Sequence, residues 1–173
     1  MENNKSAKEI LESIFSNINS WLNFAEAKNA ALIAFNIAIM AALLGNTDIL
    51  LNCKYAFYTV NTMILISSGL ALWSFKPDTG NNKKDMQVIR EDDNLLLYSH
   101  VAKYTKEKYL VAIYKNYLNE IKQEDNFSKI ELDYADEITY NARITVNKYK
   151  WFRRALWVDL ISLVGIFILF IAG

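Results

Sequence analysis

The chain is poor in the residues that most enzymes and metal sites need. Its 173 residues include one cysteine, Cys53, one histidine, His100, one proline and five glycines. One cysteine cannot build a disulfide framework, and one histidine cannot form the histidine pair of the common zinc motifs. The sequence contains no HExxH, CxxC or GxSxG motif and no phosphate-binding glycine loop. We therefore predict that the protein is not an enzyme and has no catalytic residue, no metal site and no cofactor.

An excess of charge of either sign is also lacking. The 19 basic residues balance the 19 acidic ones, so the formal net charge is zero. Nucleic-acid polymers bind through a net positive surface, and they are not expected partners. Acidic pairs such as Asp136-Glu137 are typical of solvated helix faces, which argues against a hydrolytic pair of carboxylates.

Three stretches of the chain contain almost no charged residues. Residues Ala30–Leu44 carry no charge, residues Tyr55–Phe75 carry none and have aromatic residues at both ends, and residues Ala155–Gly173 carry only Asp159. A helix needs about 20 predominantly apolar residues to cross a bilayer, with a range of about 17–25. A buried core helix is the alternative for the first and shortest stretch. We predict three membrane-spanning helices, with the lipid bilayer as a partner.

Basic residues flank these predicted spans on one side. They are Lys28 before the first span, Lys76, Lys83 and Lys84 after the second, and Lys148, Lys150, Arg153 and Arg154 before the third. The loop between the first two spans offers only Lys54 against Asp48. Because cytoplasmic loops carry the excess of lysine and arginine, we predict that the N-terminus and residues 76–154 are cytoplasmic and the C-terminus external.

The chain divides into four consecutive segments of an all-α fold. The segments are an amphipathic N-terminal helix (1–28), a two-span hairpin (29–75), a cytoplasmic helical domain (76–127) and a stalk helix that continues into the third span (128–173). Capping boxes at Ser6–Glu9 and Ser128–Glu131 predict where the first and last helices begin. At about 1.5 Å per residue, the last helix is expected to extend roughly 65–70 Å.

The predicted cytoplasmic domain contains one clear helix. Thr105 is expected as its N-cap, and a single stripe recurs at helical spacing, formed by Leu110, Ile113, Tyr117 and Ile121. The shorter apolar segment Asn94–Lys103 fits either a helix or a buried strand.

Three polar residues lie inside the predicted spans: Asn36, Asn61 and Asp159. Polar groups are costly in a bilayer and often face a bundle interior or water. Asn36 and Asn61 are interpreted either as hydrogen-bonding links between helices or as pore-lining residues. Asp159 is expected to form an interfacial ion pair with Arg154, about one turn earlier on the same helix.

Several short motifs carry a family resemblance. Trp21 and the segment Phe24-Ala-Glu-Ala-Lys-Asn-Ala30 precede the first span, Val101–Tyr109 follows later, and Ile138–Ala155 combines a Lys-Tyr pair with a basic pair before the last span. In this order the motifs resemble the transmembrane effectors of Pycsar antiphage systems and, more broadly, other multi-span bacterial defence effectors. The family usually has aspartate where this chain has Glu26.

The resemblance implies a bacterial antiphage effector of the inner membrane. Such a protein is quiet until infection, then senses a cyclic nucleotide, cyclic UMP or cyclic CMP, and disrupts the membrane, as a homo-oligomer. Two other functions stay open on the residues alone: a non-conducting membrane anchor or adaptor for a cytoplasmic partner, and a small channel subunit.

If a nucleotide is sensed, its phosphate needs cations and its base needs a flat partner. The candidate cations are Arg90, Arg143 and Lys148. The candidate stacking residues are Tyr109 and Tyr140, with Tyr114 as a further possibility.

Overall fold

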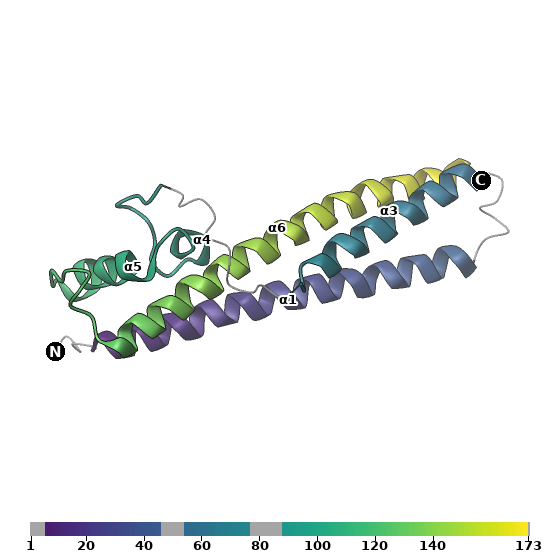
Figure 1. The fold of residues 1–173 in the computed structure, drawn as a ribbon. Coiled ribbons are helices and arrows are strands. Elements are labelled where there is room, and N and C mark those ends of the chain that lie inside the picture. Colours follow the sequence, from purple (N-terminus) through teal and green to yellow (C-terminus); the bar gives the residue numbers. More distant parts are fainter. Residues whose placement is uncertain (1–5, 46–53, 77–87, 173) are drawn as a thin grey trace, which may run out of the picture. The chain divides into compact units, whose positions relative to one another are not determined.

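The computed structural model describes residues 6–45, 54–76 and 88–172. No β-strand occurs in these ranges. The helices in chain order are α1 (Ala7–Gly45), α3 (Lys54–Trp73), α4 (Tyr98–Val101), α5 (Lys106–Ile113), the π-helical turn η2 (Tyr114–Leu118) and α6 (Lys129–Ala172) (Figure 1). The predicted all-α fold class is confirmed, and the segment Asn94–Lys103 contains the short helix α4.

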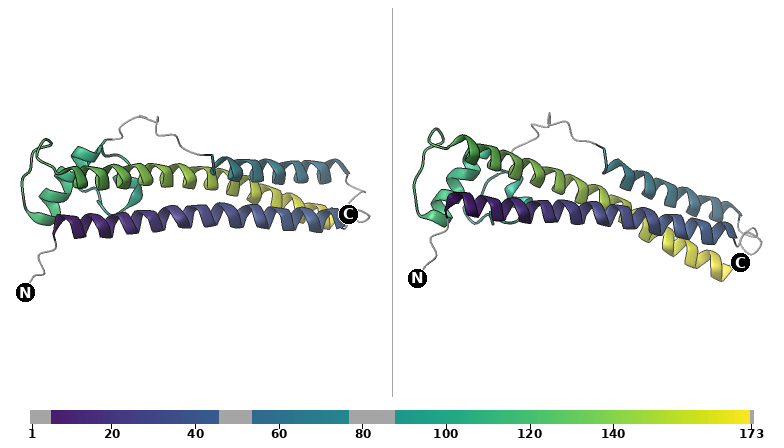
Figure 2. Two further views of the ribbon diagram at one scale, coloured as in Figure 1. Left: turned by 60° about the horizontal axis from the view of Figure 1, so that its bottom comes forward. Right: turned by 90° about the horizontal axis from the view of Figure 1, so that it is seen from below.

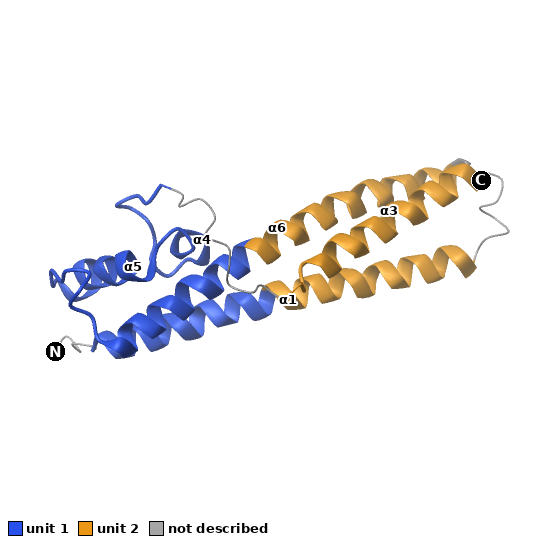
Figure 3. Ribbon diagram, viewed as in Figure 1, with its two compact units in different colours: residues 1–24, 78–146 blue, residues 25–77, 147–173 orange. Residues whose placement is uncertain are grey.

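The described residues form two compact units, each assembled from separate stretches of the chain (Figure 3). Unit 1 comprises residues 1–24 and 78–146, and unit 2 comprises residues 25–77 and 147–173. The four segments predicted from the sequence describe the order along the chain, whereas these units describe which stretches pack together. Helices α1 and α6 contribute residues to both units.

The long helices of unit 1 begin at the two predicted capping boxes. Glu9 accepts the Ser6 backbone N–H at 3.0 Å and donates its own N–H to Ser6 Oγ at 3.3 Å. Ser128 and Glu131 repeat this pattern, at 2.7 Å and 3.4 Å. Each box satisfies backbone donors that the first helical turn leaves without partners, which fixes where α1 and α6 start.

Unit 1 has one apolar core. Leu11, Ile14 and Ile18 recur at helical spacing on α1 and are almost completely buried. They belong to the same cluster as residues of α5 and of the first half of α6, including Leu110, Ile113, Ala135, Ile138 and Ala142. The amphipathic pattern of the N-terminal segment therefore reflects packing within unit 1.

The predicted stripe on α5 is only half correct. Thr105 caps the helix as expected, accepting the Lys108 backbone N–H, and Leu110 and Ile113 are buried. The helix then passes into the π-helical turn η2 and ends at Asn119, whose backbone is left-handed with φ 55°. Because this turn breaks the 3.6-residue period, Tyr117 is 41% exposed and Ile121, beyond the helix, is 97% exposed.

Unit 2 contains the apolar parts of α1, α3 and α6. All three helices are long and apolar enough to cross a membrane, so the predicted number of spans is confirmed. Within this unit they run side by side (Figure 2). One buried cluster joins Leu43, Val60 and Leu169, and a second joins Leu32, Ala71 and Ala155. At Gly165, an added Cβ would lie 2.9 Å from Val60 Cγ2, so the glycine permits close approach of α3 and α6.

Candidate functional sites

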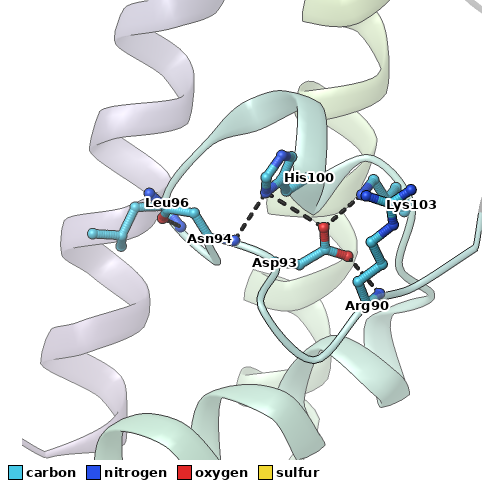
Figure 4. Close-up of polar contacts among 6 residues, drawn as sticks. All are labelled: Arg90, Asp93, Asn94, Leu96, His100 and Lys103. Carbon is cyan, nitrogen blue, oxygen red and sulfur yellow. Dashed lines mark hydrogen bonds and ion pairs between the residues drawn. The ribbon is translucent and has the colours of Figure 1, made fainter.

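A polar cluster in unit 1 centres on the buried carboxylate of Asp93 (Figure 4). It accepts the Arg90 backbone N–H at 3.0 Å and the Lys103 ammonium at 2.5 Å. His100 Nδ1 lies 3.4 Å from the same carboxylate and accepts the Asn94 backbone N–H at 2.9 Å. The cluster thereby fixes the turn that leads from Arg90 into α4.

The environment of Asp93 favours its ionised form. Burial by itself raises the pKa of this carboxyl, but the hydrogen bonds from Arg90 and Lys103 and the positive charge of Lys103 act in the opposite sense. The net result is a pKa below the ordinary value for aspartate. The neighbouring phenol of Tyr104 responds in the other direction: burial and the charge of Asp93 both raise its pKa.

A cavity of about 290 Å³ in unit 1 adjoins this turn. Its volume is just below the usual range for small-ligand pockets, about 300–1,000 Å³. The lining residues are Ile89, Arg90, Glu91, Tyr104, Lys108, Val111, Ala112, Lys115, Asn116 and Glu124. Three of them are the cations Arg90, Lys108 and Lys115, two are the acids Glu91 and Glu124, and one is the aromatic residue Tyr104, so the lining has an excess of one positive charge for an anion.

The helical segment over residues 106–118 supplies two of the three cations that line the cavity. Lys108 and Lys115 are seven residues apart, with Val111 and Ala112 between them on the same face. Two ammonium groups on one helix face suit a phosphate, while Glu91 and Asn116 can accept hydrogen bonds from ligand hydroxyl groups. The geometry therefore suits a small anionic ligand that also carries hydroxyl groups.

The two arginines predicted to bind a ligand occupy different positions. Arg90 lines the cavity. Arg143 donates from Nε to the Ala102 carbonyl at 3.3 Å and from Nη2 to the Tyr104 carbonyl at 2.6 Å. These two bonds fasten the turn after α4 to α6, and this turn contains Tyr104, one of the lining residues.

The other predicted ligand residues are not among those that line the cavity. Tyr109 is fully buried and donates to the Leu95 carbonyl at 2.7 Å, and burial raises the pKa of its phenol. Tyr140 is half-buried on α6, and the hydroxyl of Tyr114 donates to Glu131. Lys148 belongs to unit 2, where its ammonium donates to the Ser74 carbonyl at 3.1 Å and lies 3.1 Å from Glu26.

Sequence reasoning missed Lys108, Lys115 and Tyr104 as cavity residues. The spacing of seven between the two lysines was a usable signal, because it corresponds to one face of a regular helix starting after Thr105, although Lys115 lies in η2, just beyond the end of α5. The contribution of Tyr104 depends on a turn held by Arg143 from a distant part of the chain, and no local pattern indicates it.

A second polar cluster lies in unit 2, among the three apolar helices. Asn36 of α1 is fully buried and donates from Nδ2 to Ser67 Oγ and Ser68 Oγ of α3, both at 3.2 Å. Ser67 in turn donates to the Ala155 carbonyl of α6 at 3.0 Å. One chain of hydrogen bonds thus connects α1, α3 and α6, as expected of polar links between membrane helices.

Asp159 joins this cluster, and the predicted ion pair with Arg154 is wrong. The Asp159 side chain is buried, with the residue 3% exposed, and lies close to Asn36 and Ser67. Neither carboxylate oxygen has a hydrogen-bond partner among the described residues. Arg154 instead lies over the Trp151 ring at 4.7 Å. Five residues correspond to about 500° of helical rotation, so the two side chains point to different faces of α6.

Asn61 is separate from this cluster. Its Nδ2 donates to the Phe57 carbonyl of its own helix at 2.9 Å, so it makes no bond to Asn36. Its Oδ1 is buried and has no partner in the described part of the chain. Of the three predicted span residues, the structure therefore brings together Asn36 and Asp159.

The two motifs next to the predicted spans pack against each other in unit 2. Glu26 of the first motif forms the ion pair with Lys148 of the last one. The Lys28 ammonium lies 5.3 Å from the Tyr149 ring centroid and 5.7 Å from that of Phe152. An acid and a lysine two residues apart on α1 thus meet a lysine and aromatic residues on α6.

Within the described ranges, no group of three or more His, Cys, Asp or Glu side chains could hold a metal ion. Cys53 lies outside the described residues.

The fold and these clusters define an all-α, multi-pass membrane protein. A family model described as PycTM, the Pycsar effector protein domain, matches residues 10–173. The chain belongs to this family and is a Pycsar antiphage effector with a transmembrane region. The family is not a known enzymatic one. Comparisons with curated proteins and with solved structures gave no match.

Proposed function

We propose that the protein responds to a cyclic nucleotide and then disrupts the inner membrane as a homo-oligomer. The observation that carries the proposal is the cavity of unit 1, where Arg90, Lys108 and Lys115 gather beside Tyr104 in a chain that also has three membrane-spanning helices. Membership of the Pycsar effector family supports a nucleotide signal.

The cavity suits the parts of a cyclic mononucleotide. The cyclic phosphate carries one negative charge, for which the two lysine ammonium groups and the Arg90 guanidinium are suitable partners. A pyrimidine base is flat and can stack on the Arg90 guanidinium, while Tyr104, which is 4% exposed, offers a small contact area. The limited volume, about 290 Å³, favours one nucleotide over an oligonucleotide. Cyclic UMP and cyclic CMP are accordingly the activators that we propose.

Membrane disruption calls for an oligomer, because three helices cannot enclose a wide aqueous path. Unit 2 presents large exposed apolar side chains on all three helices, including Phe35, Leu65, Ile161, Val164 and Phe167. Such faces suit lipid or a second copy of the chain. The asymmetry of basic residues supports an arrangement with residues 76–154 in the cytoplasm and the C-terminus outside.

Purified full-length protein in liposomes provides the test. We expect trapped dye to leak after addition of cyclic UMP or cyclic CMP, and we expect no leakage with linear UMP or without nucleotide. Calorimetry on the same protein should show binding of the active nucleotide. Leakage that is independent of every nucleotide, or none with any cyclic mono- or oligonucleotide, would contradict the proposal.

Substitutions in the cavity make the test specific. The double variant Lys108→Ala, Lys115→Ala should bind the nucleotide at least about tenfold more weakly, because two charge-assisted bonds to phosphate are lost. Lys129→Ala is the matched control, since this lysine is exposed, pairs with Asp133 and does not line the cavity. Equal loss of binding in both variants would remove the cavity from the proposal.

The alternatives from the sequence give different results in the same assay. An anchor or adaptor would leave the liposomes intact under all conditions, and its overproduction would be tolerated by cells. A small channel subunit would show ion-selective currents without any nucleotide.

A further inference from the structure

The cluster around Asp159 in unit 2 has more hydrogen-bond acceptors than donors. The hydroxyl hydrogens of Ser67 and Ser68 are used for carbonyl groups of Ala155 and Ile64, at 3.0 Å in both cases. The Asn36 amide hydrogens point to the two serine oxygens. Asn36 Oδ1 and both oxygens of Asp159 are buried without a partner in the described residues. These three acceptor atoms call for at least one further proton donor at this position.

In the described part of the chain, no cation is paired with Asp159. On α1, residues 29–45 contain no charged residue, and the nearest charges are Glu26 and Lys28. On α3, Lys54 and Lys76 lie at or beyond the helix ends, and Tyr55 and Tyr58 are the other titratable residues. On α6, Arg153 and Arg154 precede Asp159, and no charged residue follows it up to residue 172. Lys28, Lys148 and Arg154 are each engaged with other groups of unit 2.

We propose that Asp159 is a proton-binding site within the helices of unit 2, where it is held as a neutral carboxylic acid whose hydroxyl group donates to Asn36 or Ser67. Two observations carry this assignment: the residue is 3% exposed beside the fully buried Asn36 and Ser67, and three acceptor atoms of the cluster have no donor in the described residues. An ionised carboxylate among membrane helices is expensive, whereas a protonated one supplies the missing donor. The step is the binding of one proton from water to one carboxylate oxygen.

The bound proton completes a polar chain through all three helices of unit 2. The chain starts at Asp159 on α6, passes through Asn36 on α1 and Ser67 on α3, and returns to the Ala155 carbonyl on α6. Every member of this chain is uncharged in the protonated state. The packing of unit 2 is therefore linked to the proton concentration, independently of whether a nucleotide is the activator.

Infrared spectroscopy of the full-length protein in detergent or nanodiscs tests the protonation state directly. With carboxyl-labelled aspartate, we expect the carbonyl band of a protonated carboxylic acid at pH 7, shifted in heavy water. The band should disappear in Asp159→Asn and persist in Asp133→Asn, a control on the same helix whose side chain is exposed. Absence of this band in the wild-type protein at pH 7 would overturn the proposal.

The pH dependence of stability gives a second measurement that does not depend on the label. An aspartate in the unfolded chain ionises near pH 3.9, so keeping it neutral in the fold reduces stability progressively above that pH. The melting temperature of Asp159→Asn minus that of the wild type should therefore rise by about 3–5 °C per pH unit from about pH 4 upward. A difference that is constant with pH would contradict a bound proton.

A bound monovalent cation is the competing explanation for a cluster rich in oxygen atoms. In that case sodium chloride, compared with choline chloride at equal ionic strength, would raise the melting temperature of the wild type but not of Asp159→Asn. That outcome would overturn proton binding. Equal melting temperatures in the two salts, together with the infrared band, would support it.

Discussion

At the scale of single residues, two buried aspartates are stabilised in opposite ways. Asp93 in unit 1 accepts a backbone N–H and a lysine ammonium and has a histidine ring beside it. Asp159 in unit 2 has none of these donors. The first is therefore suited to stay ionised as a structural anion, and the second is the one we assign to a bound proton.

We predict that Asp93→Asn destabilises the protein by about 1.5–3 kcal/mol at pH 7, the range for hydrogen bonds to a charged group. The variant leaves the Lys103 ammonium with no opposite charge at its hydrogen-bond distance. Thermal melting monitored by circular dichroism measures the difference. Asp92→Asn is the control, because this neighbour is exposed and should change stability by no more than about 0.5 kcal/mol.

Comparison of the wild type with Asp93→Asn also gives a prediction about the pH dependence of stability. Because the pKa of Asp93 is below its ordinary value, its contribution is complete above the unfolded pKa, about 3.9. That contribution is lost as the pH falls further, through the folded pKa. The difference in stability between the wild type and Asp93→Asn should consequently be constant from pH 7 to about pH 4 and shrink below it. A difference that shrinks instead between pH 7 and pH 5 would be inconsistent with this assignment.

Asn36 and Asn61 should respond differently to replacement by leucine. Asn36 bonds to α3, so Asn36→Leu should weaken helix association by roughly 0.6–2 kcal/mol. Asn61 bonds within its own helix, so Asn61→Leu should weaken it less. Unfolding of the protein in mixed detergent micelles compares the two variants. Equal costs would show that the bonds between α1 and α3 contribute little.

Labelling separates packing from pore lining at the same position. In a background without Cys53, Asn36→Cys should react with a water-soluble thiol reagent only in the nucleotide-activated state if Asn36 lines an aqueous path. Protection under all conditions would restrict Asn36 to its packing role.

At the scale of elements, one lysine of unit 2, Lys148, connects α6 to α1 and to the end of α3. Lys148 on α6 reaches Glu26 on α1 and the Ser74 carbonyl just after α3. We predict that Lys148→Met, which preserves an apolar stem, destabilises the protein by about 1–3 kcal/mol, because the carbonyl and the acid both lose their partner. Chemical unfolding in detergent provides the measurement.

Glu26→Gln is the informative comparison for this lysine. The Glu26 side chain is 45% exposed, so the ion pair itself is worth about 0.5–1 kcal/mol. The bond from Lys148 to the Ser74 carbonyl stays in this variant. If Glu26→Gln were as destabilising as Lys148→Met, the ion pair would outweigh the carbonyl bond.

The end of η2 gives a prediction about backbone conformation. Asn119 has φ 55°, a conformation that asparagine and glycine tolerate and that β-branched residues do not. Asn119→Val should lower the free energy of unfolding by about 1–2 kcal/mol. Asn119→Gly should change it by no more than about 0.5 kcal/mol. Equal thermal stability of the two variants would contradict the importance of this turn.

Local patterns predicted the elements well, and they failed where the chain departs from a regular helix. Capping signals and apolar periodicity were sufficient to predict where α1, α5 and α6 begin, since these signals act within a few residues. The π-helical turn has no such signal, so Tyr117 and Ile121 were placed on a buried stripe in error. Likewise, counting residues from Arg154 to Asp159 suggested proximity, although helical rotation separates their faces.

The candidate sites depend on contacts between distant residues, which explains why sequence reasoning recovered them only in part. Arg90, which lines the cavity, was a candidate because a phosphate needs a cation. Asn36 and Asp159, which share one cluster, were candidates because polar residues are unusual in membrane spans. The partners Ser67 and Tyr104 are common residue types in ordinary contexts. Their roles arise only when α3 meets α1 and when Arg143 fixes the turn after α4.

At the scale of the whole molecule, the orientation in the membrane is still a prediction. If residues 76–154 are cytoplasmic, Lys129→Cys in a background without Cys53 should not react with a membrane-impermeant thiol reagent in intact spheroplasts. It should react after lysis. Labelling of intact spheroplasts would place this segment outside and reverse the predicted topology.

The interleaved make-up of the two units limits how the protein can be divided experimentally. Unit 1 needs residues 6–24 as well as residues 88–146, because Leu11, Ile14 and Ile18 fill its core. A truncation that starts after the second span would lack these side chains and expose the apolar face of α6. A water-soluble ligand-binding fragment would therefore have to join residues 6–24 to residues 88–146 through a new linker. Deletion series made by simple truncation would report the loss of the core of unit 1 before they report anything about signalling.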